Sequence, residues 1–223
     1  MDRPLITVIT PTTGRPSLQR LVESIERQNS DGSIFHLLLW DDFRDPAALP
    51  PGTFDAAHRM SVVLGRGFGR NGDAPGSPLR AVGLMAANTP WVTFADDDVW
   101  WEPEHVSVIE TATRGVNWVS TLRVIWSPDG RRLGVDRFES VGDSVSRRVP
   151  YEMCDNNCMV FRRELGVRAA ALYRETRAYN DDRLMYGFLK SEAGVPGKTG
   201  RPTINHVCPD RLVQFFEQNC SMD

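Results

Sequence analysis

Two patterns of buried strands, separated by one amphipathic helix, constrain the fold more than any other feature of the sequence. Residues 5–10 and 35–40 are almost continuously apolar, as expected for strands that are covered on both faces. The segment between them carries apolar residues at the i, i+3, i+4, i+7 spacing of a buried helix face, namely Leu18, Leu21, Val22 and Ile25. Strand, helix and strand in this order predict two parallel strands joined by a right-handed crossover, the building unit of an α/β sheet.

The remaining patterns extend this unit. We expect further strands at residues 61–64, 91–94, 117–126, 131–135 and 158–161, and helices at 78–88, 103–113, 162–173 and 181–192. Residues 65–77, 136–149 and 194–202 are predicted to be loops, and the segment from residue 206 onward a tail packed on the domain. The fold class is therefore α/β, with a mixed, mainly parallel sheet flanked by helices.

Composition excludes several classes of protein. The chain has 223 residues, of which 41% are hydrophobic and 25% charged, as in an ordinary globular protein. A net charge of −3 offers no general basic surface for nucleic acid. No apolar run approaches the roughly 20 residues of a membrane span. The amino-terminal residues lack the apolar core of a signal peptide, so we expect a cytoplasmic location.

The cysteines allow two interpretations. Cys154 and Cys158, with His206 and Cys208, have residue types that bind zinc, but the spacing is not that of a standard zinc finger or ribbon. The chain has four cysteines, including Cys220, which are too few for a disulfide framework in a chain of this size. Reduced, partly buried thiols are the favoured interpretation.

Three successive carboxylates, Asp96, Asp97 and Asp98, follow directly on the apolar run that begins at Trp91. Adjacent acids repel one another unless a cation or hydrogen-bond donors compensate them. In open α/β sheets, ligands bind at the carboxyl ends of the strands, where these acids would lie. Mg²⁺ or Mn²⁺ commonly joins a few carboxylates to substrate phosphates, so one hypothesis is a metal–diphosphate site. The alternative is a solvated acidic turn before the next helix.

Several motifs in chain order resemble the GT-A nucleotide-sugar glycosyltransferases, in particular the large family 2. The resemblance covers about residues 5–206 and rests on the opening strand and turn (6–17), the acidic strand end (37–42), a helix with an Arg-x-x-Gly pattern (80–83), a DXD-like strand (93–101), an acidic helix start (180–182) and His206. It implies a single GT-A domain, with about residues 1–101 as the nucleotide-binding half and about 102–223 as the acceptor-binding half.

The resemblance also implies a donor site. The base and diphosphate would lie near Thr10, Pro11 and Arg15, with Asp96 and Asp97 beside these residues. Arg80 would lie within reach of the base or phosphates. Asp41 or Asp42 would accept the imide N–H of uracil, which favours a UDP-sugar. Trp100 and Trp101 are candidates for stacking on a sugar ring.

The same resemblance assigns the chemistry. Asp98 would bind Mn²⁺ or Mg²⁺ directly, Asp96 would contact the metal or the ribose, and His206 would complete the metal site. Asp182, with Asp181 as the close alternative, would act as the general base that activates an acceptor hydroxyl, which gives inversion at the anomeric carbon. The structural alternatives are a satisfied histidine and an acidic helix cap.

Departures from the family pattern leave parts of the site open. Ala81 stands where relatives carry Asn, and Asp41-Asp42 is followed by Phe43-Arg44 rather than Gly-Ser. The glycine-rich acceptor loop of many relatives is replaced by residues 154–158, so the acceptor and the sugar stay unassigned. Two other functions are weighed: a sugar-1-phosphate nucleotidyltransferase, whose Gly-rich motif after the first strand is lacking, and a non-catalytic nucleotide-sugar-binding domain of the same fold.

Overall fold

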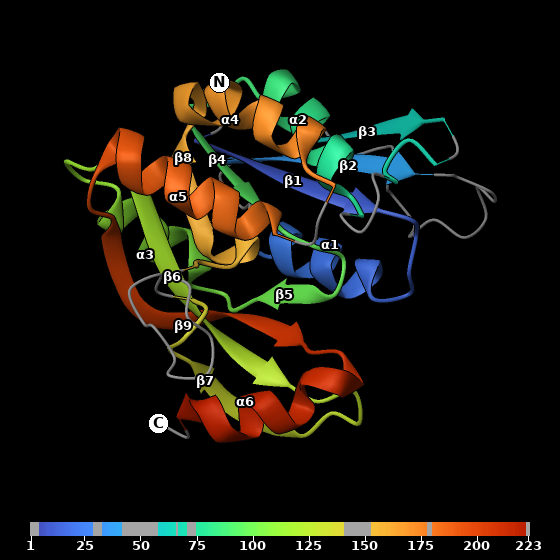
Figure 1. Ribbon diagram of the computed structural model, residues 1–223, viewed down its shortest axis with the longest axis vertical. Coiled ribbons are helices and arrows are strands. Elements are labelled where there is room, and N and C mark those ends of the chain that lie inside the picture. The colour runs from blue at the N-terminus through green and yellow to red at the C-terminus, as the bar shows by residue number, and fades with distance from the viewer. Residues whose placement is uncertain are drawn as a thin grey trace.

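The computed structural model describes residues 5–28, 33–41, 58–65, 67–70, 75–140, 153–177 and 180–221. Within these residues the strands form one sheet in the order β10-β7-β6-β8-β4-β1-β2-β3, and β9 pairs with both β5 and β6. Figure 1 shows the parallel strands in the upper part of the molecule and the antiparallel strands β6 and β7 below them.

The parallel half of the sheet contains β1 (Ile6–Thr12), β2 (Ile34–Asp41), β3 (Arg59–Leu64) and β4 (Trp91–Phe94). β2 and β4 flank β1, and all these neighbouring pairs are parallel. α1 (Leu18–Glu26) connects β1 to β2, and α2 (Ser77–Ala86) connects β3 to β4. The predicted crossover unit is confirmed, and the carboxyl ends of β1, β2 and β4 meet at one edge of the sheet.

The other half of the sheet is antiparallel. β8 (Met159–Arg162) joins β4 to β6 (Trp118–Trp126), which forms the predicted hairpin with β7 (Arg132–Asp136). The last strand is β10 (Cys220–Ser221). β5 (Val99–Trp101) starts immediately after the acidic turn and pairs with β9 (Gly197–Val207). This pairing brings His206 opposite Val99, one residue beyond Asp98.

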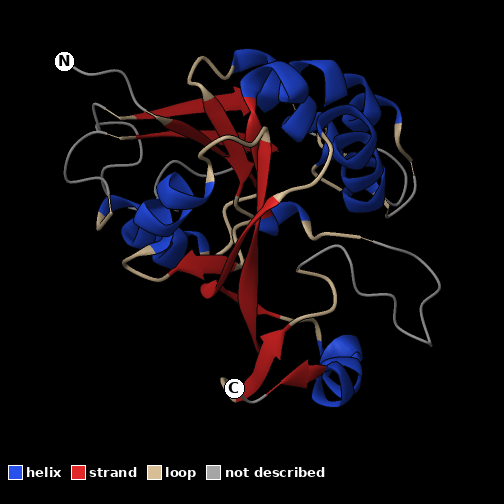
Figure 2. Ribbon diagram, turned by 90° about the vertical axis from the view of Figure 1, so that its left-hand side faces the viewer, coloured by secondary structure: helices blue, strands red, loops and turns tan. Residues whose placement is uncertain are grey.

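Helices cover both faces of the sheet (Figure 2). α2 packs on β1 and β2 and on α4 (Arg163–Glu175), which in turn contacts α5 (Asp181–Ala193). α1 packs on β5, and α3 (His105–Ala112) packs on β9. The short helix α6 (Val213–Asn219) lies against β7, near the carboxyl terminus (Figure 1).

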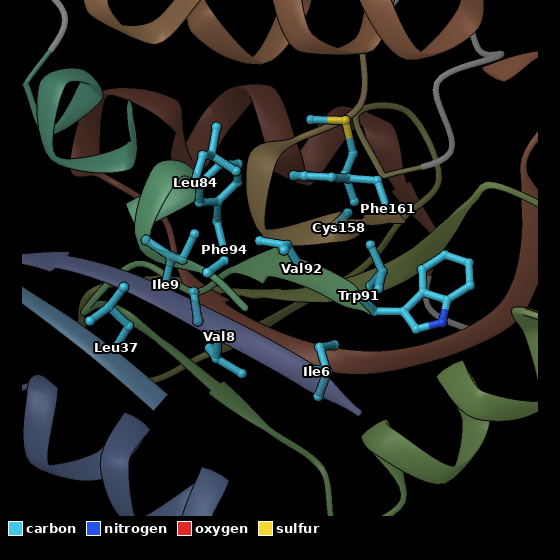
Figure 3. Packing of buried hydrophobic residues seen from close by; sticks show 14 of the residues in the cluster. Ile6, Val8, Ile9, Leu37, Leu84, Trp91, Val92, Phe94, Cys158 and Phe161 are labelled. Atoms are coloured by element: carbon cyan, nitrogen blue, oxygen red, sulfur yellow. The ribbon is translucent and has the colours of Figure 1, made fainter. Parts of the chain in front are cut away.

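The core lies between the parallel strands and α2 and α4. Figure 3 shows Ile9 of β1, Phe94 of β4 and Leu84 of α2 packed side by side, with Phe161 of β8 close to them. All four side chains are fully buried. α2 approaches β1 closely because position 83 is glycine: a Cβ atom there would lie 2.4 Å from Cγ2 of Ile9.

Residues 194–202 are only partly the loop that their polar composition predicts. β9 begins at Gly197 and runs to Val207, so the prediction was wrong for most of this segment. Its first half is largely exposed and polar, and its strand conformation comes from backbone pairing with β6 rather than from an apolar pattern. The segment from residue 206 is likewise more ordered than a tail, since His206 belongs to β9 and α6 and β10 follow it. No described helix is both long and apolar enough to cross a membrane.

Candidate active site

A cavity of 520 Å³ opens at the carboxyl ends of β1, β2 and β4. It collects most of the predicted site residues, which are Pro11, Arg15, Asp41, Arg80, Asp96, Asp97, Asp98, Asp181 and Asp182. Its wall also contains Thr12, Thr13, Gly69, Arg70, Pro75, Gly76, Leu79, Asp155, Asn156 and Pro209. These residues come from both halves of the sequence, so the strand ends and α5 face one shared space.

The acidic turn after β4 gives Asp96 and Asp97 separate hydrogen-bond donors. Asp96 accepts a hydrogen bond from the guanidinium of Arg80 and another, at 3.2 Å, from Nδ2 of Asn157. Asp97, which is 2% exposed, accepts from Arg15 and, at 2.6 Å, from the hydroxyl of Thr12. Three adjacent acids are therefore tolerated because separate donors compensate two of them, without any requirement for one shared cation.

Arg80 is the cation that joins two acidic segments. It is buried on α2 and contacts Asp96 on one side and Asp181, at 3.1 Å, on the other. Burial opposes its charged form, but the facing carboxylates of Asp96 and Asp181 outweigh this and raise the pKa of Arg80. Ser77 also donates to Asp181 at 2.8 Å. Asp181 is consequently fixed to α2, at the start of its own helix.

Asp98 presents its two oxygens to different surroundings. Oδ1 is buried and has no hydrogen-bond partner, and it lies 3.9 Å from Nε2 of His206. Oδ2 is 3.4 Å from Arg15, beyond the distance of a strong hydrogen bond. Because Oδ1 is buried, Oδ2 is the oxygen that the cavity can reach.

This donor set fits a hard divalent cation held by one carboxylate. Mg²⁺ in particular is commonly bound by one or two carboxylates, with water and substrate phosphates as its other ligands. Of the predicted metal set Asp98, Asp96 and His206, both oxygens of Asp96 accept hydrogen bonds from Arg80 and Asn157, and His206 is not in the cavity wall. Among the described residues, no three His, Cys, Asp or Glu side chains form a group that could hold a metal by itself. The four cysteines, all described, are free thiols.

Asp182 lies on the α5 side of the cavity, next to Asp181, and no arginine of the described residues forms an ion pair with it. Its Oδ1 accepts only the backbone N–H of Arg183, at 2.7 Å. Burial, together with the nearby charges of Asp155 and Asp181, raises the pKa of Asp182 to about 7. A carboxylate of this kind exchanges a proton near neutral pH, as a general base must.

Asp155 was not singled out by the sequence as a site residue, although it belongs to the segment flagged for replacing the family's acceptor loop. It precedes a short turn of 3₁₀ helix, Asn156–Cys158, and lines the cavity. Partial burial of Asp155 opposes its charged form, but the guanidinium of Arg123 outweighs this and lowers the pKa of Asp155 to about 2. It therefore stays ionised and adds negative charge beside Asp182.

Arg123 lies behind the cavity at the junction of β6, β7 and β9. It is 1% exposed, and its guanidinium contacts the carboxylates of Asp136, Glu139 and Asp155. The same group lies 3.0 Å from Nδ1 of His206. No sequence pattern distinguished this arginine, because its partners come from three separate segments of the chain.

Other predicted residues lie apart from the cavity. Thr10 is fully buried, and its hydroxyl forms a hydrogen bond of 2.9 Å with His36. β1 continues two residues further than expected, so Thr12 takes the place at the strand end that Thr10 was predicted to occupy. Trp101 is buried against His105, and Trp100 stacks under the guanidinium of Arg20. Neither tryptophan is in the cavity wall, and Asp42 falls outside the described residues.

Asp41 ends β2 at the opposite side of the cavity. It is 6% exposed, and its Oδ1 is buried without a hydrogen-bond partner. Gly69 lies against the other oxygen, since a Cβ atom at that position would be 2.8 Å from Oδ2. Asp41 lines the cavity, so its carboxylate group can accept a hydrogen bond from an N–H of a ligand.

Comparison with solved structures identifies the architecture. The structure of residues 1–349 of Staphylococcus aureus TarS superposes with a TM-score of 0.68 and 16% identity, covering 98% of this chain and 67% of that chain. The chain has the GT-A fold. The same part of TarS in complex with UDP-GlcNAc gives a TM-score of 0.70 at 15% identity, covering 98% of this GT-A chain and 68% of the other.

The chain spans only part of the longer relative. Against the structure of TarS as a whole, the TM-score is 0.61 at 14% identity, with 98% of this GT-A chain but 40% of TarS covered. No family model matches the sequence, and no curated protein matches it. At sequence identities this low, the similarity to TarS shows the GT-A fold alone.

Proposed function

We propose that this protein is a glycosyltransferase that moves a sugar from a nucleotide-sugar donor, with UDP-sugars favoured, to an acceptor hydroxyl, with metal assistance and inversion at the anomeric carbon. One observation carries the proposal: a single cavity brings together the carboxylate of Asp41, the partly exposed carboxylate of Asp98, and the carboxylate of Asp182, whose pKa is raised to about 7. The UDP-GlcNAc and UDP complexes of TarS, which shares the fold, support the choice of donor.

The nucleotide end of the donor is assigned to Asp41. Its carboxylate, which lines the cavity, is suited to the imide N–H of uracil, which a cytosine ring lacks. Arg15 and Arg70 line the same cavity and are exposed enough to meet a diphosphate, since the side chain of Arg15 is 53% exposed. Arginine is suited to binding a diphosphate because its planar guanidinium can donate two parallel hydrogen bonds to phosphate oxygens.

The acceptor end is assigned to Asp182. As the acceptor oxygen approaches the anomeric carbon, Asp182 takes its proton, and the bond from that carbon to the diphosphate oxygen breaks. Attack from the face opposite to the leaving group inverts the centre. Asp182 is preferred to Asp181 for this role, because Arg80 and Ser77 donate hydrogen bonds to Oδ2 of Asp181 and hold it against α2.

The departing diphosphate gains negative charge, and Asp98 is the residue that would hold a divalent cation to offset it. When bound, Mn²⁺ or Mg²⁺ acts as a Lewis acid toward that charge. Arg80 pairs with both Asp96 and Asp181 and offsets one of their two negative charges, so the net negative charge that the donor meets is smaller than seven cavity aspartates imply.

The proposal is tested by thermal shift with Mn²⁺, then UDP, then both, followed by intact UDP-sugars. A ligand that binds only the native state raises the melting temperature, and we expect the largest rise with metal and UDP together. Slow metal-dependent hydrolysis of a UDP-sugar supports transfer. Exchange of pyrophosphate with UTP would instead indicate a nucleotidyltransferase, and binding without any turnover would indicate a binding domain.

Asp182→Asn provides the decisive variant. It should lower hydrolysis or transfer by roughly 10²–10⁴-fold, the usual contribution of a general base, and leave metal-dependent UDP binding unchanged. Asp210→Asn is the matched control, because Asp210 is exposed and outside the cavity wall. Unchanged turnover in Asp182→Asn would remove Asp182 from the role.

A further inference from the structure

The contact between Arg123 and His206 determines where the imidazole carries its proton. The guanidinium lies 3.0 Å from Nδ1 of His206. Arginine stays protonated in proteins and can only donate hydrogen bonds, so Nδ1 must be the acceptor. In the neutral imidazole, the single proton then sits on Nε2. We propose that Arg123 holds His206 in the Nε2–H form, so that His206 positions Asp98 as a hydrogen-bond donor and is not a ligand of the metal.

The other side of the ring supports this assignment. Nε2 faces Oδ1 of Asp98 at 3.9 Å, and that oxygen is buried without any hydrogen-bond partner. A shift of about 1 Å would bring the pair to the length of an N–H···O bond. Such a bond would leave Oδ2 pointing toward the cavity. Carboxylates that bind metals are commonly held by outer hydrogen bonds of this kind.

A metal bond through Nε2 is incompatible with the same geometry. It would require the proton on Nδ1, where it would point at an N–H of Arg123. Histidines that bind metals instead donate their second N–H to a carboxylate, carbonyl or water. Arg123 has little freedom to move away, because Asp136 binds its Nε at 2.9 Å while Glu139 and Asp155 bind the remaining nitrogens.

The inference rests on the proposed function for the role of Asp98, but the tautomer can be measured without any ligand. We would label the histidines with ¹⁵N and record the imidazole signals of the free protein, and then of the protein with Mg²⁺ and UDP. The chain has four histidines, and the spectrum of His206→Gln assigns the signals of His206. We expect a protonated Nε2 and an unprotonated Nδ1 in both states. A protonated Nδ1 in either state would overturn the proposal.

A pair of substitutions separates a donor from a ligand. Gln places an amide N–H near the position of Nε2, whereas Glu supplies a good oxygen ligand for a hard cation and no donor. We expect His206→Ala to lower kcat/KM and the affinity for Mn²⁺ in the presence of UDP by about 10–100-fold, as loss of an outer-shell contact does. His206→Gln should recover both to within about threefold, because it restores the donor.

His206→Glu should not restore activity, because its charge would face Oδ1 of Asp98. Recovery by Glu but not by Gln would show a metal ligand and overturn the proposal. Mn²⁺ binding is read from the signal of free Mn²⁺ in electron paramagnetic resonance, independently of turnover. If metal and UDP fail to bind the unsubstituted protein, the proposed function fails, while the spectrum of the free protein still decides the tautomer.

Discussion

The guanidinium of Arg80 donates a hydrogen bond of 3.1 Å to Asp181 and leaves the neighbouring Asp182 without such a partner. Two adjacent acids at the start of α5 thereby acquire different tasks. Asp181, with Arg80 and Ser77, fixes the helix start to α2. Asp182 keeps a carboxylate whose pKa is raised to about 7 by burial and by the charges of Asp155 and Asp181. Perturbed groups that lie in a cavity are candidates for catalysis on physical grounds.

The pH dependence of turnover follows from this pKa. A general base works only when deprotonated, so kcat/KM should fall about tenfold per pH unit below pH 7 and level off above it. The measurement is the initial rate of UDP-sugar hydrolysis from pH 5 to 9 at saturating metal. A rate that stays flat down to pH 5 would exclude Asp182 as the titrating base.

The charged form of Asp182 should also lower the free energy of unfolding. Its folded-state pKa lies above the unfolded value of 3.8, so its contribution to stability is present below about pH 4 and is lost as the pH rises through about 7. Asp182→Asn should therefore stabilise the protein at pH 8, by about 1–2 kcal/mol after allowance for solvent screening of a half-buried carboxyl. Urea denaturation at pH 8 and pH 4 provides the comparison.

The gain from Asp182→Asn should disappear at pH 4, where the wild-type carboxyl is protonated. Glu139, whose pKa is raised to about 7 mainly by burial, acts in the same direction and is retained in the variant, so some pH dependence should persist. An equal gain at both pH values would point to a cause other than charge.

Asp41→Asn should change the preferred nucleotide. In the proposed function the wild-type carboxylate accepts the N–H of uracil, whereas the amide of Asn can also donate to the ring nitrogen of cytosine. We expect UDP affinity to fall about 5–150-fold, as for a lost hydrogen bond to a charged partner of 1–3 kcal/mol, and CDP to lose much less. Calorimetric titration with both nucleotides measures the ratio. An unaltered UDP-to-CDP ratio would assign base recognition to another residue.

Much of the fold could be predicted because most elements carry an apolar period. The continuous apolar run of β1 and the one-sided stripe of α1 determine the parallel half of the sheet. β9 escaped prediction because its residues are mixed in polarity and its strand form depends on pairing with β6, a partner about 80 residues away in the chain. Pairing over such a distance leaves no local signal.

The candidate site was predictable where acids follow strand ends and helix starts, as for Asp41, the acidic turn and Asp182. Contacts that depend on the packing of distant segments could not be predicted. The contacts of Asp97 to Thr12 and of Arg123 to His206 join residues more than 80 positions apart. Sequence position alone also could not divide roles among Asp96, Asp97 and Asp98, because the turn sends each side chain to a different element.

The stability of the protein should be sensitive to a side chain at Gly83 in α2, the helix that carries Arg80, but not to one at Gly187 in α5. A Cβ atom at Gly83 would lie 2.4 Å from Ile9 and 3.0 Å from Leu39, so Gly83→Ala should destabilise the protein by about 1–3 kcal/mol through overpacking. Gly187 of α5 is the matched control, since a Cβ atom there meets nothing within 4 Å. Gly187→Ala should stabilise the protein by about 0.5–1 kcal/mol through helix propensity alone. Opposite shifts in melting temperature are therefore expected from the same substitution. Two shifts of the same sign would contradict the close approach of α2 to β1, on which the position of Arg80 in the cavity depends.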